Sequence, residues 1–312
     1  MAQPILFEST TRPADVFDPW AGDTVSSWSE LHARIDEINE RHGQGDLYWR
    51  GVTDATFGLY SSLYRRLKCT RRAVTEDLMV SEEKRILSRA RRDWRFDNMS
   101  ALEIFAHIQH YGGPTRLLDV TKNPLIAAWF AVEQQYRPDG SPAPPTDARM
   151  FCFYGGDGIG LESQWGSRTP AWFDWTSTKE RREHSWGDGT NRRIWVPPAY
   201  NPRIPAQNAA FIVDGVPFSY GGSNGFTMGP GHIDKRWHIG PLRDAGSIPF
   251  KPNDHTRAKQ TDRSTPAFTI RIGSGAVSQI RDRIERDYGY SVSSLYGDLY
   301  GMATKVSPHL PD

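Results

Sequence analysis

The chain has 312 residues, with 38 Lys and Arg against 37 Asp and Glu, so its formal net charge is only +1. This balance excludes a protein that binds polyanions with its whole surface, although it leaves room for a local basic patch. A membrane-spanning helix needs about 20 apolar residues. The longest apolar run, residues 125–132, is far shorter, so we expect no membrane partner. Two cysteines, Cys69 and Cys152, exclude a disulfide framework, and we expect a cytoplasmic protein.

Composition and local patterns predict a leader over residues 1–23 and one folded domain over residues 24–312. A hydrophobic content of 38% with 12% aromatic residues is typical of a folded domain rather than of disorder. Apolar residues at helical spacing begin after Ser26, a candidate N-cap, and the helix is expected to end at His42. A short aromatic strand, residues 47–52, follows and carries Arg50.

The later elements are predicted from the same two periodicities and from turn residues. Helices are expected over residues 76–94, 101–109, 125–133 and 276–288. Strands are expected over residues 115–121, 150–154, 194–196, 210–213 and 268–272. Asn123 and Pro124 are typical of a helix start, with Asn as the N-cap and Pro at the first helical position.

Residues 155–192 are rich in Gly, Trp and charge and have no sustained period, which predicts a long irregular insertion. Four tryptophans of this insertion suggest an aromatic lid over a ligand: Trp165, Trp172, Trp175 and Trp186.

Three motifs carry little functional weight. His107 and His110 have a spacing that can hold a metal ion, but no third ligand accompanies them, so no metal is predicted. The G-x-S-x-G string at residues 221–225 lacks the strand and the helix that a nucleophile elbow needs. The glycines of residues 156–160 depart from the dinucleotide-binding spacing.

Polar residues on predicted buried strands indicate a ligand site. Arg50 must be paired or must face a ligand, because an unpaired buried charge is too costly, and a guanidinium forks well onto phosphate. A second polar group lies in and just before one predicted strand, ahead of a helix N-terminus, and consists of His110, Arg116, Asp119 and Thr121. Polar side chains in this position suit a phosphate or a ribose. Arg203 and Gln207 precede a later strand. The structural alternative is that Arg50 and Asp119 pair to hold two strands together.

These residues belong to a longer pattern that resembles the FRG domain family of bacteria. The Phe-Arg-Gly signature of that family appears as Trp49-Arg50-Gly51. The most specific segment is Gln109-His110-Tyr111-Gly112-Gly113-Pro114-Thr115-Arg116-Leu117-Leu118-Asp119-Val120-Thr121. Further matching segments are Leu59 to Arg65, Asn123-Pro124-Leu125, Trp129-Phe130-Ala131, Tyr200 to Gln207 and Ser294 to Leu299.

The FRG pattern in turn resembles a diverged ADP-ribosyltransferase. This resemblance implies a single α+β domain with a mixed or antiparallel split sheet, helices around it and long irregular insertions. It also implies NAD as the substrate, with Arg50 and Gly51 on its phosphate side and the segment from Asp119 to Thr121 in place of the serine motif. Gln207 would stand near the place of the catalytic Glu, and Asp119 or His110 would supply the charge that Gln lacks.

The resulting function hypothesis is an NAD-dependent ADP-ribosyltransferase that acts as a bacterial toxin or phage-defence effector. Tyr48 or Tyr111 would stack on nicotinamide, while Arg116 and Arg203 complete the NAD site. The acceptor, a nucleic acid or a protein, would lie near residues 65–95, because residues 64–95 hold eleven basic and five acidic side chains. An antitoxin or immunity protein would be a further partner.

Two alternatives stay open at this point. One is a sensor module that binds a nucleotide or nucleic acid without turnover, because the catalytic Glu is replaced. The other is a metal-independent phosphodiesterase or nuclease that uses His110 and Asp119.

Overall fold

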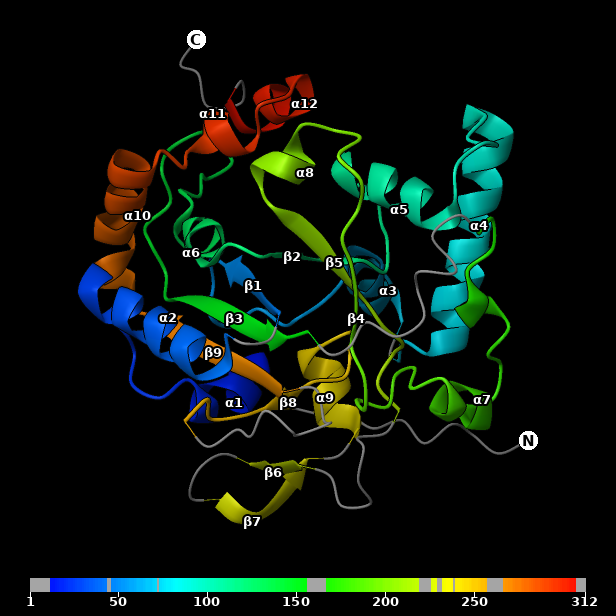
Figure 1. Ribbon diagram of the computed structural model, residues 1–312, viewed down its shortest axis with the longest axis horizontal. Coiled ribbons are helices and arrows are strands. Elements are labelled where there is room, and N and C mark those ends of the chain that lie inside the picture. Colours follow the sequence, from blue (N-terminus) through cyan, green and yellow to red (C-terminus); the bar gives the residue numbers. More distant parts are fainter. Residues whose placement is uncertain are drawn as a thin grey trace.

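The computed structural model describes residues 12–43, 46–71, 73–155, 167–218, 226–228, 232–237, 239–256 and 266–306. A curled seven-stranded sheet lies at the centre of one domain, and helices surround it (Figure 1). The strand order is β4-β5-β2-β1-β3-β9-β8, and only β8 and β9 pair in parallel. This confirms the predicted mixed α/β domain with helices packed around its sheet.

The sheet strands come from distant parts of the chain. They are β1 (Leu47–Val52), β2 (Leu118–Thr121), β3 (Ala148–Tyr154), β4 (Arg193–Trp195), β5 (Ala209–Val213), β8 (Lys251–Pro252) and β9 (Pro266–Ile272). A separate two-stranded ribbon pairs β6 (Phe226–Met228) with β7 (His232–Trp237).

The helices fall into three groups around the sheet (Figure 1). The first group is α2 (Trp28–His42), α6 (Pro124–Val132), α10 (Ser274–Tyr288) and α11 (Val292–Leu295). The second is α1 (Pro13–Phe17), η1 (Asp18–Trp20) and α9 (Ile239–Ala245). The third is α3 (Ser62–Thr70), α4 (Glu76–Trp94), α5 (Ala101–His110), η3 (Ala171–Phe173) and α7 (Thr178–Glu183). Three short elements complete the chain: α8 (Arg203–Ala206), α12 (Leu299–Gly301) and the π-helical turn η4 (Met302–Val306).

Alternation along β1 divides the core between the two faces of the sheet. Trp49 is buried with residues of α2, α6 and α10, while Tyr48 is buried on the other face with residues of α1 and α9. Trp49 therefore supports the face on which the strongly apolar helix α6 packs.

Local capping explains where the main helices begin. Asn123 accepts hydrogen bonds from the backbone N–H groups of Leu125 and Ile126, and Pro124 occupies the first turn, as predicted. Helix α2 begins one residue later than predicted, because Ser27 caps it and Ser26 instead bonds the Glu30 carboxylate.

Gly51 lets α6 lie directly against β1. A Cβ atom at this position would come within 1.9 Å of the Ala127 carbonyl oxygen and 2.5 Å of the Ala131 nitrogen. Both are backbone atoms of a buried helix, so they cannot rotate out of the way. The glycine of the Arg-Gly pair therefore sets the distance between strand and helix, and with it the position of Arg50.

Parts of the predicted leader and of the predicted insertion form regular structure. Residues 13–20, within the predicted leader, form α1 and η1, and Phe17 is buried in the core. The predicted insertion contains η3 and α7 in its described part. Residues 156–166 and 219–225, which include both glycine-rich motifs and Trp165, lie outside the described residues.

Candidate active site

A cavity of about 550 Å³ opens where β1 and β2 separate. The two strands pair only through Trp49 and Thr121, whereas β1 and β3 pair along the whole of β1. Segments from both halves of the chain line the cavity, which we call the cleft. Its lining includes seven of the predicted site residues: Arg50, Gly51, His110, Asp119, Thr121, Arg203 and Gln207.

The Arg50 guanidinium crosses the gap between the two strands. Its Nη1 donates to the Asp119 carbonyl oxygen at 2.8 Å and lies 3.7 Å from the Asp119 carboxylate. The side chain is 21% exposed, and its buried Nε has no hydrogen-bond partner. Burial lowers the pKa of Arg50; Asp119 opposes this effect and the neighbouring Arg65 adds to it. The cleft thus holds a cation whose hydrogen-bonding capacity is only partly used.

Asp119 is the carboxylate that faces the solvent in this gap. Its side chain is 59% exposed and accepts a hydrogen bond of 2.9 Å from Gln109 Nε2. The Gln109 amide is itself held, because its oxygen accepts from Thr115 at 2.5 Å and from Ser62 at 3.2 Å. Gln109 therefore orients Asp119. We had not predicted this role, although Gln109 opens the most specific segment of the family pattern.

Thr121 and Gln207 connect β2 to the segment before β5. Thr121 Oγ1 donates to the Gln207 carbonyl oxygen at 2.7 Å. The Gln207 side-chain Nε2 donates to the Leu295 carbonyl oxygen at 2.9 Å. The amide nitrogen of Gln207 is therefore engaged, and its Oε1 is the atom left to meet a ligand in the cleft.

His110 belongs to a polar cluster centred on Asp298, which we had not singled out as a site residue. Asp298 Oδ2 lies 3.2 Å from His110 Nε2 and 2.6 Å from Arg203 Nε. Burial and Arg203 lower the pKa of His110, while Asp298 opposes this shift. The motif residue Asp298 also caps α12, which fixes the C-terminal segment beside the cleft.

The structure places Tyr48 and Tyr111 outside the lining of the cleft. The Tyr48 ring is buried in the core beneath α1 and α9, and Lys122 Nζ lies 5.4 Å from its centroid. Tyr111 is exposed next to the cleft and meets the His110 ring edge-on at 4.8 Å. Of the two, only Tyr111 lies beside a residue that lines the cleft.

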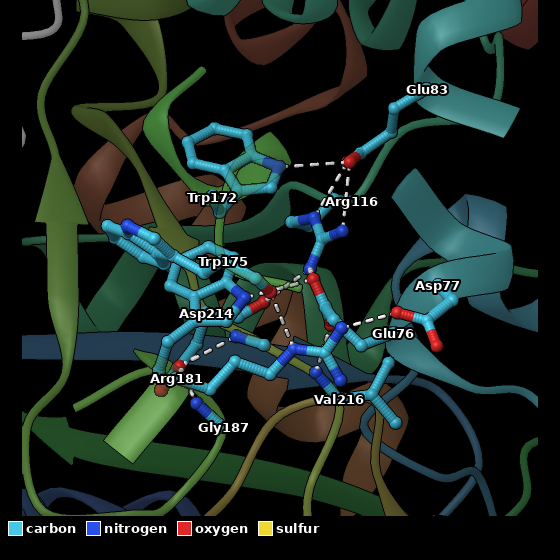
Figure 2. A network of polar contacts seen from close by, with 12 residues as sticks. Glu76, Asp77, Glu83, Arg116, Trp172, Trp175, Arg181, Gly187, Asp214 and Val216 are labelled. Atoms are coloured by element: carbon cyan, nitrogen blue, oxygen red, sulfur yellow. Dashed lines mark hydrogen bonds and ion pairs between the residues drawn. The ribbon is translucent and has the colours of Figure 1, made fainter. Parts of the chain in front are cut away.

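Arg116 is buried in the core and does not line the cleft, contrary to our expectation. Figure 2 shows its guanidinium between Glu83 and Glu76. Its side chain is 2% exposed and pairs with Glu83 at 2.7 Å and with Glu76 at 2.8 Å. Trp172 and Trp186 donate to these carboxylates at 3.0 and 2.9 Å. Two carboxylates and the Asp214 carbonyl oxygen accept hydrogen bonds from the Arg116 guanidinium, so Arg116 stabilises the fold and is not available to a ligand.

The expected aromatic lid is wrong for Trp172 and Trp186. Both indoles are fully buried and stack at 5.1 Å with an interplanar angle of 15°. Trp175 is partly buried against them and stacks on His184 at 4.4 Å. Trp172 and Trp186 therefore fill the core between the insertion and α4, where their indole N–H groups donate to the buried glutamates.

Two further features of the described residues bear on the class of site. No group of three or more His, Cys, Asp or Glu side chains in this part of the chain could hold a metal ion. None of its helices is both long enough and apolar enough to cross a bilayer.

Comparison with known families supports the resemblance. Residues 45–140 match the family model of the FRG domain, which confirms the resemblance stated from the sequence. The match runs from β1 to the loop after α6 and includes Arg50, Gln109 and Asp119. Neither a curated protein nor a solved structure matches the chain. Arg203 and Gln207 lie beyond the matched residues.

Proposed function

We propose that the cleft binds NAD and that the protein is an ADP-ribosyltransferase, acting as a toxin or phage-defence effector. The observation that carries the proposal is the Arg50 guanidinium, which is partly desolvated at the strand gap and has a buried Nε without a partner. Arg65 lines the same cleft and has no carboxylate partner among the described residues. A diphosphate would satisfy both groups, because guanidinium donors match phosphate oxygens.

The size and lining of the cleft suit a dinucleotide. Its volume of about 550 Å³ falls within the usual range for ligand pockets. Phe57, Tyr200 and Tyr296 supply aromatic surface beside the charged groups. The Tyr200 hydroxyl is buried without a hydrogen-bond partner, which gives a second polar atom that a ligand could satisfy.

The proposed reaction breaks the bond between ribose C1′ and the nicotinamide nitrogen. The acceptor atom forms a bond to C1′, nicotinamide leaves as a neutral molecule, and the acceptor loses a proton. Asp119 would stabilise the positive charge that develops on the ribose, with Gln109 holding its carboxylate in place. Gln207 Oε1 would accept a hydrogen bond from a ribose hydroxyl.

The test is nicotinamide release from NAD by the purified chain and by two variants. Arg50→Ala should weaken NAD binding, and Asp119→Asn should lower the rate of release at saturating NAD. Arg283→Ala, on the exposed face of α10, is the matched control and should behave as the wild type. Equal activity of the wild type and Arg50→Ala would contradict the proposal.

The second candidate is a sensor that binds NAD or another nucleotide without turnover. The engaged Gln207 amide favours it, because this residue can neither act as a base nor carry a negative charge. Calorimetry separates the two candidates. Saturable NAD binding that disappears in Arg50→Ala, with no nicotinamide released, would identify the sensor.

A further inference from the structure

The C-terminal half of α4 exposes an indole among arginines. Trp94 is 63% exposed at the last residue of the helix. Arg89, Arg92 and Arg95 are exposed beside it in the sequence. We call this region the α4 arginine surface and include in it Arg85, Arg91 and Arg168, which contact the same segment.

This surface carries more positive than negative charge. Four of its six guanidinium groups pair with three carboxylates, those of Glu82, Asp93 and Asp97. Asp93 alone serves both Arg89 and Arg92, at 3.7 and 2.7 Å. Three positive charges are therefore left uncompensated within the surface.

A shallow depression marks the centre of the surface. It is lined by Ser88, Arg91, Arg92, Arg95 and Asp97. The Arg91 Nε atom is buried there and has no hydrogen-bond partner, while its Nη2 donates to the Arg168 carbonyl oxygen. Burial and the nearby Arg168 charge lower the pKa of Arg91. An anion in the depression would relieve both the repulsion and the missing hydrogen bond.

Helix α10 offers an internal comparison. Arg283 and Arg286 pair with Asp287 there, and Tyr288 follows, just as Arg89 and Arg92 pair with Asp93 before Trp94 on α4. The residues 281–287 are balanced, with three basic and three acidic side chains. The α4 arginine surface therefore differs from α10 in its charge excess and its depression, not in its pairing pattern.

We propose that the α4 arginine surface binds single-stranded nucleic acid, with a base stacked on Trp94 and phosphates on Arg91, Arg92 and Arg95. Exposed aromatic rings bind unpaired bases of any sequence, and arginines bind the backbone between them. A duplex cannot offer an unstacked base, and an acidic peptide has no planar base for the indole. This inference concerns a second surface and holds whether or not the cleft transfers ADP-ribose.

The experiment measures fluorescence anisotropy of a labelled single-stranded RNA of about 12 nucleotides, titrated with the full chain at several salt concentrations. Trp94→Ala should weaken binding about 10-fold, which is within the usual value of one stacked base. The double variant Arg92→Gln with Arg95→Gln should lower the slope of log affinity against log salt by about 1.4, or about 0.7 for each lost contact.

The matched controls lie on α10. Tyr288→Ala and the double variant Arg283→Gln with Arg286→Gln remove the same chemistry from a balanced surface, so they should bind RNA as the wild type does. All substituted side chains are exposed, and urea unfolding checks that every variant stays folded. Nicotinamide release from NAD with water as the acceptor should be the same in Trp94→Ala and the wild type.

Three outcomes would overturn the inference. One is RNA binding that is unchanged in Trp94→Ala, and another is an equal loss in the α10 variants. The third is equally tight binding of a duplex or of an acidic peptide with the same charge. RNA binding by a wild-type protein that releases no nicotinamide would instead count against the proposed function alone.

Discussion

Arg50 and Arg116 stand on or beside neighbouring strands of one sheet, yet their surroundings differ in every respect that decides a role. Two carboxylates pair with Arg116 (Figure 2), and the indoles of Trp172 and Trp186 donate to these carboxylates. Arg50 has one carboxylate at 3.7 Å, which is itself largely exposed, and it keeps a buried nitrogen without a partner. A guanidinium with complete partners stabilises a fold, whereas one with incomplete partners can bind a ligand.

The difference also shows in how the two neighbourhoods are built. Around Arg116, residues of α4, α5, η3, β4 and β5 form one buried cluster, and the insertion supplies the two tryptophans. Around Arg50, the strands separate and leave a cleft that the C-terminal segment closes on one side. The Arg116 network therefore stabilises the packed part of the domain, and the cleft lies beside this part.

The largest expected effect is the loss of the Arg116 charge. Arg116→Met should lower the free energy of unfolding by about 3–5 kcal/mol, because Glu76 and Glu83 are then buried without a cation. Arg50→Met should change it far less, since its partner Asp119 is exposed. Urea unfolding of both variants measures the contrast. Equal destabilisation would show that Arg50 is also a structural residue.

Gly51→Ala should have the next largest effect. The added methyl group would overlap the backbone of α6 at Ala127, so strand and helix must separate. We expect a loss of about 1–3 kcal/mol, the usual cost of overpacking a core. Gly140→Ala is the control, because a Cβ there meets nothing within 4 Å, although its positive φ adds a small strain. If the urea midpoint of Gly51→Ala equals that of the wild type, the close contact between β1 and α6 is contradicted.

Most of the fold could be predicted from local patterns. The Asn123-Pro124 start of α6 and the periodicity of α4 and α10 are properties of neighbouring residues, and these elements form where they were expected. The short elements β8, α8 and α12 had no such pattern. Their backbone is fixed by tertiary partners, as at α12, where Asp298 joins Arg203 and His110.

The site was predicted less completely, for a physical reason. The partners of Arg116 lie 33 and 40 residues before it, so its burial depends on long-range pairing that the sequence does not display. The sequence likewise does not show that Trp172 and Trp186 are buried, because their hydrogen-bond partners Glu83 and Glu76 lie far away in the chain. The cleft residues were easier to identify because the family pattern groups them.

A smaller effect concerns pH and the carboxyl group beside the Arg116 network. Burial raises the pKa of Asp214 to about 7, although Arg193 and the N–H groups of Gly187 and Gly215 oppose the shift. The folded state therefore binds more protons than the unfolded state between about pH 4 and pH 7. The free energy of unfolding should fall as the pH rises through this window and become level above it.

Asp214→Asn isolates this contribution, because the amide oxygen can still accept from both N–H groups. Between pH 5 and pH 7 the wild type should lose on the order of 1–2 kcal/mol more than the variant. Urea unfolding at the two pH values gives the difference. The same pH dependence in both proteins would show that Asp214 is not the titrating group.

The smallest expected effect is the stability coupling between Arg50 and Asp119, and it decides between the two interpretations of this pair. If the pair holds two strands together, a double-mutant cycle with Arg50→Met and Asp119→Asn will give a coupling energy similar to that of a buried pair. We expect less than about 1 kcal/mol, because Asp119 is 59% exposed and water screens the interaction. The same cycle measured on NAD binding should give non-additive losses, since both groups would face one ligand. A large coupling energy in unfolding, together with additive losses in NAD binding, would show that Arg50 is a structural residue like Arg116.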